Sequence, residues 1–352
     1  MSSAPDLSPL ADLVARAEGR STPFRVVPMP GGASTRLFYR VHFDGTTRSA
    51  VAFFVPDATR SDEIDKTDGA RHTWPFLEVH ALLAERSVRV PKILADGSDV
   101  GWLLVEDLGD DTLAAYVARE PEKREDIYRS AVRDLAIAQR ALADLPEASV
   151  VRRRAFDEDL LEWELQHFRE WALDACGRPL SSEDRAIFDG IAKRLAARIA
   201  GWPRGFVHRD YQSRNLMVRD GGNGPELVWI DFQDALLGPR VYDLVALLND
   251  SYQTFDRAFV TARIDEFGAA LGVVGSDRET LAREFDFVTV QRKLKDAGRF
   301  VFIDREKKNP AFLQFVEPTI AKARATLARL GDDEDMRVLA GMIDRYCPEA
   351  RG

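Results

Sequence analysis

The sequence predicts an α+β protein of two lobes, in which a small antiparallel sheet precedes a mainly helical lobe. Its 352 residues are many for one domain and suit two lobes. Apolar residues alternate with period two as far as Val105, whereas from Thr112 onward they recur at the three-to-four spacing of helices. We therefore expect a first lobe over residues 1–105, a hinge over 106–109 and a helical lobe over 110–352.

The first lobe is expected to contain five strands and a helix that packs on their sheet. Alternating polarity predicts strands at 24–27 and 37–43, and a continuous apolar run predicts a strand buried on both faces at 49–55. Two further strands, at 90–94 and 101–105, are expected to complete the antiparallel sheet. The helix carries Phe76, Val79, His80 and Leu83 at helical spacing, and we expect His80 to be a packed core histidine. Residues 57–73 are polar and have no clear period, so the prediction there is a loop.

The second lobe is expected to be a series of helices whose apolar residues share one face. Helical spacing covers residues 127–145, 156–173, 182–200, 242–250 and 255–352, the last with breaks at 272–276 and 304–310. No internal repeat interrupts this series. No apolar stretch in the chain reaches the roughly 20 residues that a membrane-spanning helix needs.

One stretch within the second lobe has the residue types that phosphoryl transfer requires. Asp210 ends the run His208-Arg-Asp, and Asn215 follows five positions later. In this pattern the aspartate takes the proton of an attacking hydroxyl and the asparagine holds a metal ion. Two short apolar runs, 216–218 and 227–230, then predict a hairpin that ends on Asp231, where a second carboxylate can bind the metal.

Each part of this stretch has an ordinary structural explanation when it occurs alone. A His-Arg-Asp run is common, and an aspartate at the end of a strand is often a turn residue. Here the loop, the asparagine, the hairpin and the second aspartate occur together and in order, which indicates a kinase-type centre. Within it we expect His208 and Asp243 to support the loop, with Asp243 accepting hydrogen bonds.

Composition limits the partners and the compartment. A net charge of -9 argues against a general nucleic-acid binder, which needs a basic face. The N-terminal residues lack the basic and apolar regions of a signal peptide, and two distant cysteines fit a reducing compartment. We expect a cytoplasmic monomer that acts on a small molecule, without a nucleic-acid or membrane partner.

The quoted motifs, together with Ile230-Asp-Phe-Gln-Asp-Ala235 and Gly238-Pro-Arg-Val-Tyr-Asp-Leu244, resemble the aminoglycoside phosphotransferase and choline kinase family. Within it the chain looks most like the anomeric kinases that phosphorylate N-acetylmuramate and N-acetylglucosamine in cell-wall recycling. The resemblance implies a bilobal protein-kinase-like fold, ATP and Mg2+ as cofactors, and a sugar hydroxyl as acceptor. It assigns Asp210 as catalytic base and Asn215 and Asp231 as metal ligands.

The resemblance also implies nucleotide contacts in the first lobe and hinge. The expected phosphate contacts are Gly31, Gly32 and Ser34, whose backbone N–H groups would approach the phosphate oxygens, and the expected adenine contacts are Glu106 and Leu108. The chain departs from the kinase pattern on the strand 49–55, where Phe53 and Phe54 stand in place of a phosphate-binding lysine. Phe76 stands near the position of that lysine's glutamate partner, and Glu78 takes that position if the helix register differs.

Losing both partners removes an ion pair without leaving a buried charge, which indicates a changed architecture. The expected substitutes for the lysine are Arg36 or Arg40 on the neighbouring strand, because arginine has a planar donor fork and a permanent charge.

The acceptor site is expected in the helical lobe, with four contacts implied by resemblance: Gln233, Asp234, Asp250 and Tyr252. Arg292 and Lys295 belong to a cationic cluster that can bind an acceptor carboxylate, or can simply be a solvated surface. Trp163 and Trp171, with neighbouring acids, can stack on a sugar ring or can lie on a solvated acidic face.

Two other functions fit the same motifs. One is a kinase of the same fold that phosphorylates an aminoglycoside, choline or another hydroxyl, because acceptor choice depends on the helical lobe. The other is a nucleotide-binding pseudokinase, suggested by the absent strand lysine. Retention of Asp210, Asn215 and Asp231 argues against the pseudokinase.

Overall fold

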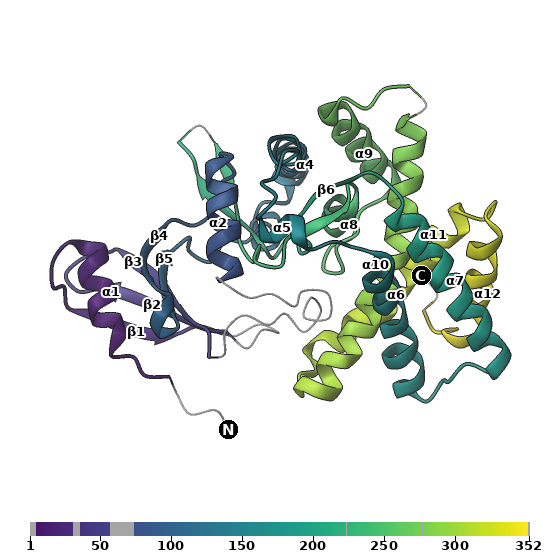
Figure 1. Cartoon of the computed structure of the whole chain (residues 1–352), viewed down its shortest axis with the longest axis horizontal. Coiled ribbons are helices and arrows are strands. Elements are labelled where there is room, and N and C mark those ends of the chain that lie inside the picture. The colour runs from purple at the N-terminus through teal and green to yellow at the C-terminus, as the bar shows by residue number, and fades with distance from the viewer. Residues whose placement is uncertain (1–4, 31–35, 57–73, 223, 276, 351–352) are drawn as a thin grey trace. The chain divides into compact units, whose positions relative to one another are not determined.

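The computed structural model describes residues 5–30, 36–56, 74–222, 224–275 and 277–350, and Figure 1 labels its helices and strands. The chain divides into two compact units. The first, here called the sheet unit, comprises Met1–Ala115 and Leu216–Asp234. The second, here called the helical unit, comprises Tyr116–Asn215 and Ala235–Gly352. The predicted boundaries at 105 and 109 stay predictions, and the hairpin after Asn215 belongs to the sheet unit.

The sheet unit contains a five-stranded antiparallel sheet, as the sequence predicts. Its strands are β1 (Phe24–Pro28), β2 (Leu37–Phe43), β3 (Ser49–Phe54), β4 (Ile93–Gly97) and β5 (Trp102–Glu106), in the order β1-β2-β3-β5-β4. Alternate residues of β3 face opposite sides, because side chains in a strand have period two. Ala50 and Ala52 join one apolar cluster and Phe53 joins the other, so β3 is covered on both faces.

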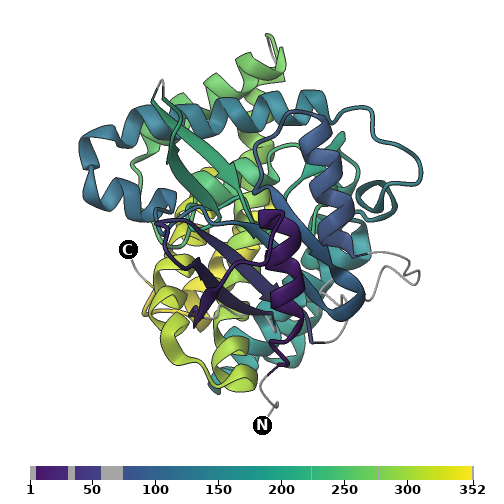
Figure 2. The ribbon, with the colours of Figure 1, turned by 90° about the vertical axis from the view of Figure 1, so that its left-hand side faces the viewer.

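Each face of this sheet is covered by one helix. Helix α1 (Pro9–Glu18) inserts Leu10, Leu13 and Val14 against the face that includes Trp102. It lies over the strands in both ribbon views (Figures 1 and 2). Helix α2 (Pro75–Glu85) places Phe76 and Leu77 on the opposite face, against Phe53 and Leu103.

The hairpin of β7 (Leu216–Asp220) and β8 (Pro225–Trp229) attaches to the sheet unit through its backbone. The Trp229 N–H donates to the Arg89 carbonyl at 2.9 Å, and the Val218 N–H donates to the Asp111 carbonyl at 2.7 Å. The Arg219 guanidinium also pairs with the Glu106 carboxylate. These bonds fix the strand whose end bears Asp231.

The helical unit is built mainly from helices with short connections. Its elements, with α3 shared at the unit boundary and several short turns, are α3 (Leu113–Arg119), α4 (Arg124–Ala141), α5 (Val150–Arg153), α6 (Glu158–His167), a π-helix η3 (Phe168–Leu173), α7 (Ser182–Ala200), β6 (Arg204–Val207), β9 (Leu236–Pro239), α8 (Tyr242–Leu248), α9 (Arg257–Leu271), α10 (Asp277–Lys307), η5 (Pro310–Phe315), α11 (Val316–Arg329) and α12 (Glu334–Tyr346).

Several of these helices begin at side-chain caps. Asp157 caps α6 by accepting from the Leu160 N–H at 2.9 Å, and Ser181 caps α7 by accepting from the Asp184 N–H at 3.0 Å. Asp256 and Asp333 cap α9 and α12 in the same way. The short polar residues before these helices therefore determine where each one starts.

Helix α10 is the central element of the helical unit, because it is buried along most of its length. Its buried residues run without a gap from Glu284 to Lys295, and they include Arg292 and Lys293. A helix buried on all sides shows no single apolar stripe in its sequence. The interpretation of residues 291–295 as a solvated surface is therefore wrong.

The two-stranded sheet of β6 and β9 was not predicted, although it leads directly into the catalytic stretch. Its strands pair from Arg204 with Pro239 to Val207 with Leu236. Strands of four residues give little alternation, and Gly238-Pro239 favours a turn when considered alone. Among the described residues, no helix combines the length and the apolar character needed to cross a membrane.

Candidate active site

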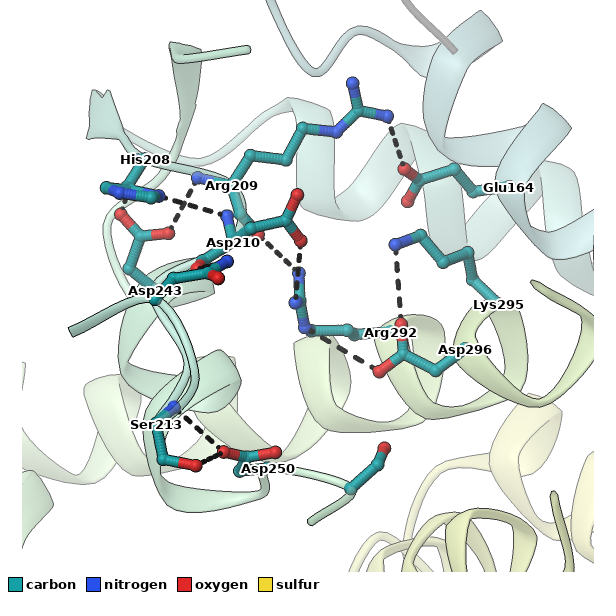
Figure 3. Close-up of polar contacts among 12 residues, drawn as sticks. Glu164, His208, Arg209, Asp210, Ser213, Asp243, Asp250, Arg292, Lys295 and Asp296 are labelled. Atoms are coloured by element: carbon teal, nitrogen blue, oxygen red, sulfur yellow. Dashed lines mark hydrogen bonds and ion pairs between the residues drawn. The ribbon is translucent and has the colours of Figure 1, made fainter. Parts of the chain in front are cut away.

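The catalytic loop follows β6 in the helical unit and is fixed by a buried carboxylate. Asp243, in the first turn of α8, accepts from the N–H of His208 at 2.6 Å and from that of Arg209 at 3.0 Å (Figure 3). Burial raises the pKa of Asp243 to about 7, while the two N–H donors and Arg292 oppose that rise. These bonds accord with the support role expected of Asp243.

Arg209 has a backbone conformation that residues other than glycine rarely adopt. Its φ is +79°, in the left-handed region, and its guanidinium donates to Glu164 at 3.2 Å. Glu164 is completely buried and also accepts from Gln291 at 2.8 Å. Such strain persists only where the surroundings enforce it, and it concentrates at functional sites. Asp243, Glu164 and the φ of Arg209 together fix the direction in which the next residue, Asp210, leaves the loop.

Asp210 is the partly exposed carboxylate of this loop, with 37% of its side chain accessible. Arg292 of α10 lies beneath it, with Nη2 at 3.6 Å from Asp210 Oδ1 and Nη1 donating to the Arg209 carbonyl at 2.8 Å. The Asp210 N–H points to His208 Nδ1 at 3.3 Å. A carboxylate that is oriented from below and open to solvent above can meet an acceptor hydroxyl.

Asn215 ends the loop, and the backbone carbonyl of Asp210 orients its side chain. Its Nδ2 donates to the Asp210 carbonyl at 2.9 Å, so the side-chain nitrogen is occupied and the amide oxygen is directed elsewhere. An amide oxygen is a suitable Mg2+ ligand. In the same loop, Ser213 donates its N–H at 2.9 Å and its hydroxyl to Asp250.

Asp250 and its neighbours do not match the sugar contacts expected of them. Asp250 is 1% exposed, and its carboxylate accepts from Ser213 and from the Tyr252 N–H. It therefore supports the catalytic loop, and a sugar hydroxyl has no access to it. The Tyr252 ring lies 3.5 Å from the Arg214 guanidinium and packs edge-on against Phe315.

Asp231, the second carboxylate of the motif, lies in the sheet unit just after β8. It has a φ of +64° and is one of four described non-glycine residues with positive φ, of which Arg209 is another. Its carboxylate is paired with Arg36, which precedes β2. Gln233 links the two, accepting from Arg36 at 2.9 Å and donating to Asp231 at 3.1 Å and to Asp234 at 3.3 Å.

The missing lysine and glutamate are replaced by an aromatic cluster. Phe53 of β3 and Phe76 of α2 meet edge-on with centroids 4.9 Å apart, and Phe76 stacks on Phe232 at 4.9 Å. His80 contacts both Phe76 and Phe232, and its Nε2 lies 2.8 Å from the Pro91 carbonyl, which fits a packed core histidine. Dispersion and burial thus join β3 to α2, where kinases use an ion pair.

Of the two arginines proposed to replace the lysine, only Arg36 pairs with Asp231, the aspartate expected to bind the metal. Arg40 instead pairs with Asp107 and Asp110, each at 2.8 Å, and so fastens the sheet to the predicted hinge. Gly31, Gly32 and Ser34 lie outside the described residues, as do residues 57–73, for which the sequence predicts a loop.

Glu106, which was expected to contact adenine, makes its hydrogen bonds within the chain. Its N–H donates to the Lys92 carbonyl at 2.8 Å, and its carboxylate accepts from Arg89 at 3.0 Å. These groups are therefore engaged within the chain. Leu108 is half-buried, and Gly109 has a φ of +78° that permits the bend after it.

Asp231 of the sheet unit and Asn215 of the helical unit, each taken by itself, carry oxygen donors of the kind that Mg2+ prefers. Within the parts of the chain that the structure describes, no three His, Cys, Asp or Glu side chains converge to bind a metal. Mg2+ in kinases is bound by one or two protein side chains and by the substrate phosphates, so a complete protein cage is not required. One carboxylate, Asp231, and one amide, Asn215, provide the two expected ligand types.

Glu164 is one of the acids beside Trp163 that were expected at the acceptor site or on a solvated face, whereas the structure buries it against Arg209. The sequence does contain a signal, because Leu160, Glu164 and Phe168 are spaced four apart on one helical face. An acid within an apolar stripe indicates a buried partner, here Arg209. Lys295, which was also predicted as a candidate, lies next to Asp296 beside the loop (Figure 3).

Comparisons with known proteins find relatives that match most of the chain. The model of the phosphotransferase enzyme family matches residues 25–311. The chain is 33% identical to the N-acetylmuramate/N-acetylglucosamine kinase of Pseudomonas aeruginosa over 91% of this chain and 90% of that protein. It is 30% identical to a protein of the same name from Neisseria meningitidis serogroup B, over 74% and 81% of the respective chains.

Solved structures show the same fold. The GDP complex of wild-type aminoglycoside 2'-phosphotransferase-IIIa aligns with a TM-score of 0.59 and 15% identity, covering 91% of this chain and all of that one. An ethanolamine kinase of Plasmodium vivax aligns with a TM-score of 0.54 and 14% identity, over 87% and 82% of the two chains. These alignments confirm the prediction of a kinase-like α+β fold.

Proposed function

This chain belongs to the phosphotransferase enzyme family, and from that premise we propose that it transfers the γ-phosphate of ATP to the anomeric hydroxyl of N-acetylmuramate or N-acetylglucosamine. The enzyme is a kinase whose acceptor is a sugar hydroxyl, as its curated relatives are named. The observation that supports the chemistry best is Asp210, a partly exposed carboxylate oriented by Arg292 and by a strained loop whose backbone is bonded to Asp243.

Asp210 would orient the sugar hydroxyl for attack on the γ-phosphorus. As the new bond from the hydroxyl oxygen to phosphorus forms, the bond to the β,γ-bridging oxygen breaks and ADP leaves with that electron pair. The hydroxyl proton passes to Asp210. In a loose transition state this proton moves late, and an anomeric hydroxyl is more acidic than an ordinary alcohol, so a weak base is sufficient.

The remaining assignments concern the nucleotide. Asn215 and Asp231 would hold Mg2+, which supplies positive charge to the phosphate oxygens when it is bound. Arg36, already paired with Asp231, would contact the phosphates in place of the absent lysine. Gly31, Gly32 and Ser34 would offer backbone N–H groups, and Leu108 in the 106–109 hinge would contact adenine.

On the acceptor side, Gln233 and Asp234 come two and three residues after Asp231 and remain proposed contacts. An aminoglycoside is the competing acceptor, because the family includes such enzymes. A cationic acceptor fits poorly beside Arg292, Lys293 and Lys295 of α10, which favours a neutral or acidic sugar. We also propose that the protein is a monomer and that it is cytoplasmic; the free thiols of Cys176 and Cys347 support a reducing compartment.

A single panel tests this function. The protein is incubated with ATP and Mg2+ together with N-acetylmuramate, N-acetylglucosamine, an aminoglycoside or choline, and phosphorus-coupled NMR locates the new phosphate. Phosphate on the anomeric oxygen of either amino sugar is expected, and transfer only to the aminoglycoside or choline contradicts the proposal. The Asp210→Asn variant is the control, and undiminished turnover by that variant would end the role of Asp210 as base.

A further inference from the structure

Arg214 is an exposed cation in the catalytic loop, directly before Asn215, the expected metal ligand. Among the residues that the structure describes, its guanidinium makes no hydrogen bond and no ion pair. The guanidinium lies instead over aromatic rings, 3.5 Å from the centroid of Tyr252 and 5.7 Å from that of Phe315. A permanently charged group with five N–H donors is therefore held in place while its donors stay available to a ligand.

The rings beneath Arg214 form a cluster drawn from three segments of the helical unit. Tyr252 follows α8 and meets Phe315 of η5 edge-on, with centroids 4.9 Å apart. Phe300 of α10 lies 6.0 Å from Phe315 and stacks on Phe312 at 5.9 Å. A guanidinium is attracted to the face of an aromatic ring, and a side chain fixed in this way loses less conformational entropy when it binds an anion.

One buried carboxylate fixes both Arg214's loop and the ring on which Arg214 rests. Asp250 accepts from the N–H and hydroxyl of Ser213 (Figure 3) and from the N–H of Tyr252 at 2.9 Å. Lys322 of α11 donates to the carbonyls of Asp250 and Gln253, on either side of Tyr252. These bonds fix the backbone of Tyr252 relative to the loop, which keeps its ring beneath Arg214.

The charges around Tyr252 place this ring near the catalytic aspartate. Burial raises the pKa of Tyr252, and the charge of Arg214 opposes that rise. Three carboxylates add to the rise: those of Asp250, Asp296 and Asp210. The first is buried against the loop and the second is paired with lysines of α10, whereas Asp210 is partly exposed. Arg214 thus has acids nearby, and its suitability for an anion comes from its available donors and not from an excess of positive charge.

The catalytic loop is compact and exposes two opposite charges, Asp210 and Arg214. The Gln212 N–H donates to the Asp210 carbonyl and the Asn215 N–H to the Gln212 carbonyl, each at 2.8 Å, so the chain turns between the two charges. The Asn215 side chain bonds back to the Asp210 carbonyl, whereas the Arg214 side chain lies across Tyr252. Neighbouring residues therefore serve different groups, which favours the acceptor over the metal and phosphates as the partner of Arg214.

The ligand that this pair of charges fits carries a hydroxyl and a carboxylate a short distance apart. N-acetylmuramate has this arrangement, because its carboxylate is on the lactyl ether of the carbon two positions from the anomeric carbon. We propose that Arg214 binds the carboxylate of an acidic N-acetylated sugar and thereby favours that acceptor over its neutral counterpart. This assignment rests on the proposed function. Tyr252, which the sequence predicted as a sugar contact, is then the support of the residue that makes the contact.

The test compares two acceptors in each variant. For Arg214→Met, kcat/KM toward N-acetylmuramate is expected to fall about 10- to 100-fold, mainly through KM, as for the loss of one charge-assisted hydrogen bond. The value toward N-acetylglucosamine is expected to stay within about threefold. The ratio of the two values, measured on one preparation, does not depend on the fraction of protein that is folded. Arg214→Lys keeps the charge without the planar donor group and should lose a smaller part of this ratio.

Two further variants separate the site from its surroundings. Arg283 also lies over a ring, that of Phe287 at 5.3 Å, but it is nine residues before Arg292 in α10, a rise of about 13.5 Å. Arg283→Met is the matched control and should leave the ratio of the two acceptors unchanged. Tyr252→Leu removes the ring that holds the guanidinium and should lower the ratio in the same direction as Arg214→Met.

A modified substrate gives the same information with the wild-type protein. Converting the carboxylate of N-acetylmuramate to a carboxamide should lower its kcat/KM by the factor seen in Arg214→Met, and combining both changes should add little.

Four results overturn the assignment of Arg214: an unchanged ratio in Arg214→Met or Tyr252→Leu, an equal loss for both sugars, the same change of ratio in Arg283→Met, or independent losses in the combined experiment. An equal loss for both sugars would assign Arg214 to the phosphates instead. In each of these cases the wild-type protein still phosphorylates an amino sugar, so the proposed function stands. If the wild-type protein phosphorylates neither sugar, the proposed function fails, and the Arg214 assignment fails with it.

Discussion

Replacing Arg292 by methionine tests whether this residue orients the catalytic aspartate. The buried guanidinium donates to the Arg209 carbonyl, lies 3.6 Å from Asp210 and sits 4.7 Å from the Tyr242 ring. An unsatisfied buried carbonyl costs about 1–3 kcal/mol. The lost cation–π contact adds about 1–2 kcal/mol. The ion pair with Asp210 adds at most about 1 kcal/mol, because Asp210 is over one-third exposed.

Part of this cost is returned, because methionine removes a charge that is expensive to bury. We therefore expect Arg292→Met to lower the free energy of unfolding by about 2–3 kcal/mol, which urea titration measures. Loss of orientation should lower kcat on the order of 100-fold for both amino sugars alike. The affinity for ATP should change little, because no nucleotide contact is assigned to Arg292.

The alternative prediction, that Arg292 binds the acceptor carboxylate, gives a different kinetic pattern. It requires KM for N-acetylmuramate to rise with kcat preserved, and N-acetylglucosamine to be unaffected. Arg292→Lys is the matched variant, because it keeps the charge and loses the planar fork. A kcat for Arg292→Met within about threefold of the wild-type value would refute the positioning argument.

Three further changes test the support of the site. Arg36→Met should weaken ATP binding about 10- to 100-fold by calorimetry, because a charge-assisted bond to phosphate is lost. Phe53→Ala should lower the free energy of unfolding by about 3–5 kcal/mol, since Phe53 is 3% exposed and contacts Phe76; urea titration measures the loss. The pKa of Asp243 is raised from its ordinary value of 3.8 to about 7 in the folded protein. At a pH between these two values, Asp243 therefore holds a proton in the folded protein but not in the unfolded chain. Its contribution to the free energy of unfolding should therefore fall as pH rises through this window, and Asp243→Asn should remove that slope in urea titrations across the window.

Each of these expectations has a contrary result. Wild-type ATP affinity in Arg36→Met would remove Arg36 from the phosphate site. A loss below about 1 kcal/mol for Phe53→Ala would mean that the aromatic cluster does not join β3 to α2. The same pH slope in the wild type and in Asp243→Asn would assign that slope to other groups.

The catalytic motif was predictable because its parts are close in sequence. Asp210, Asn215 and the hairpin before Asp231 occupy one continuous stretch, and the apolar patterns that predict the five strands are also local. The pairing of Arg36 with Asp231 joins residues 195 positions apart, so only tertiary structure reveals which of the two candidate arginines lies at the metal aspartate.

Burial caused the other differences between prediction and structure. Asp250 carries a carboxylate that a sequence cannot distinguish from an exposed sugar contact, yet it is enclosed by Ser213 and Tyr252. Helix α10 lacks an apolar stripe because every side of it is covered, which hid the position of Arg292 and Lys293. Which partner a charged residue pairs with depends on the packing of the whole unit.

The aromatic cluster of Phe53, Phe76 and Phe232 has a consequence for how this enzyme responds to its surroundings. A lysine–glutamate latch weakens as ionic strength rises, and phosphorylation nearby can compete for it. A contact between three aromatic rings carries no charge that salt or phosphorylation could affect. Any regulator that draws α2 away from β3 must expose apolar surface to water, so helix position in this kinase should be insensitive to salt and sensitive to temperature.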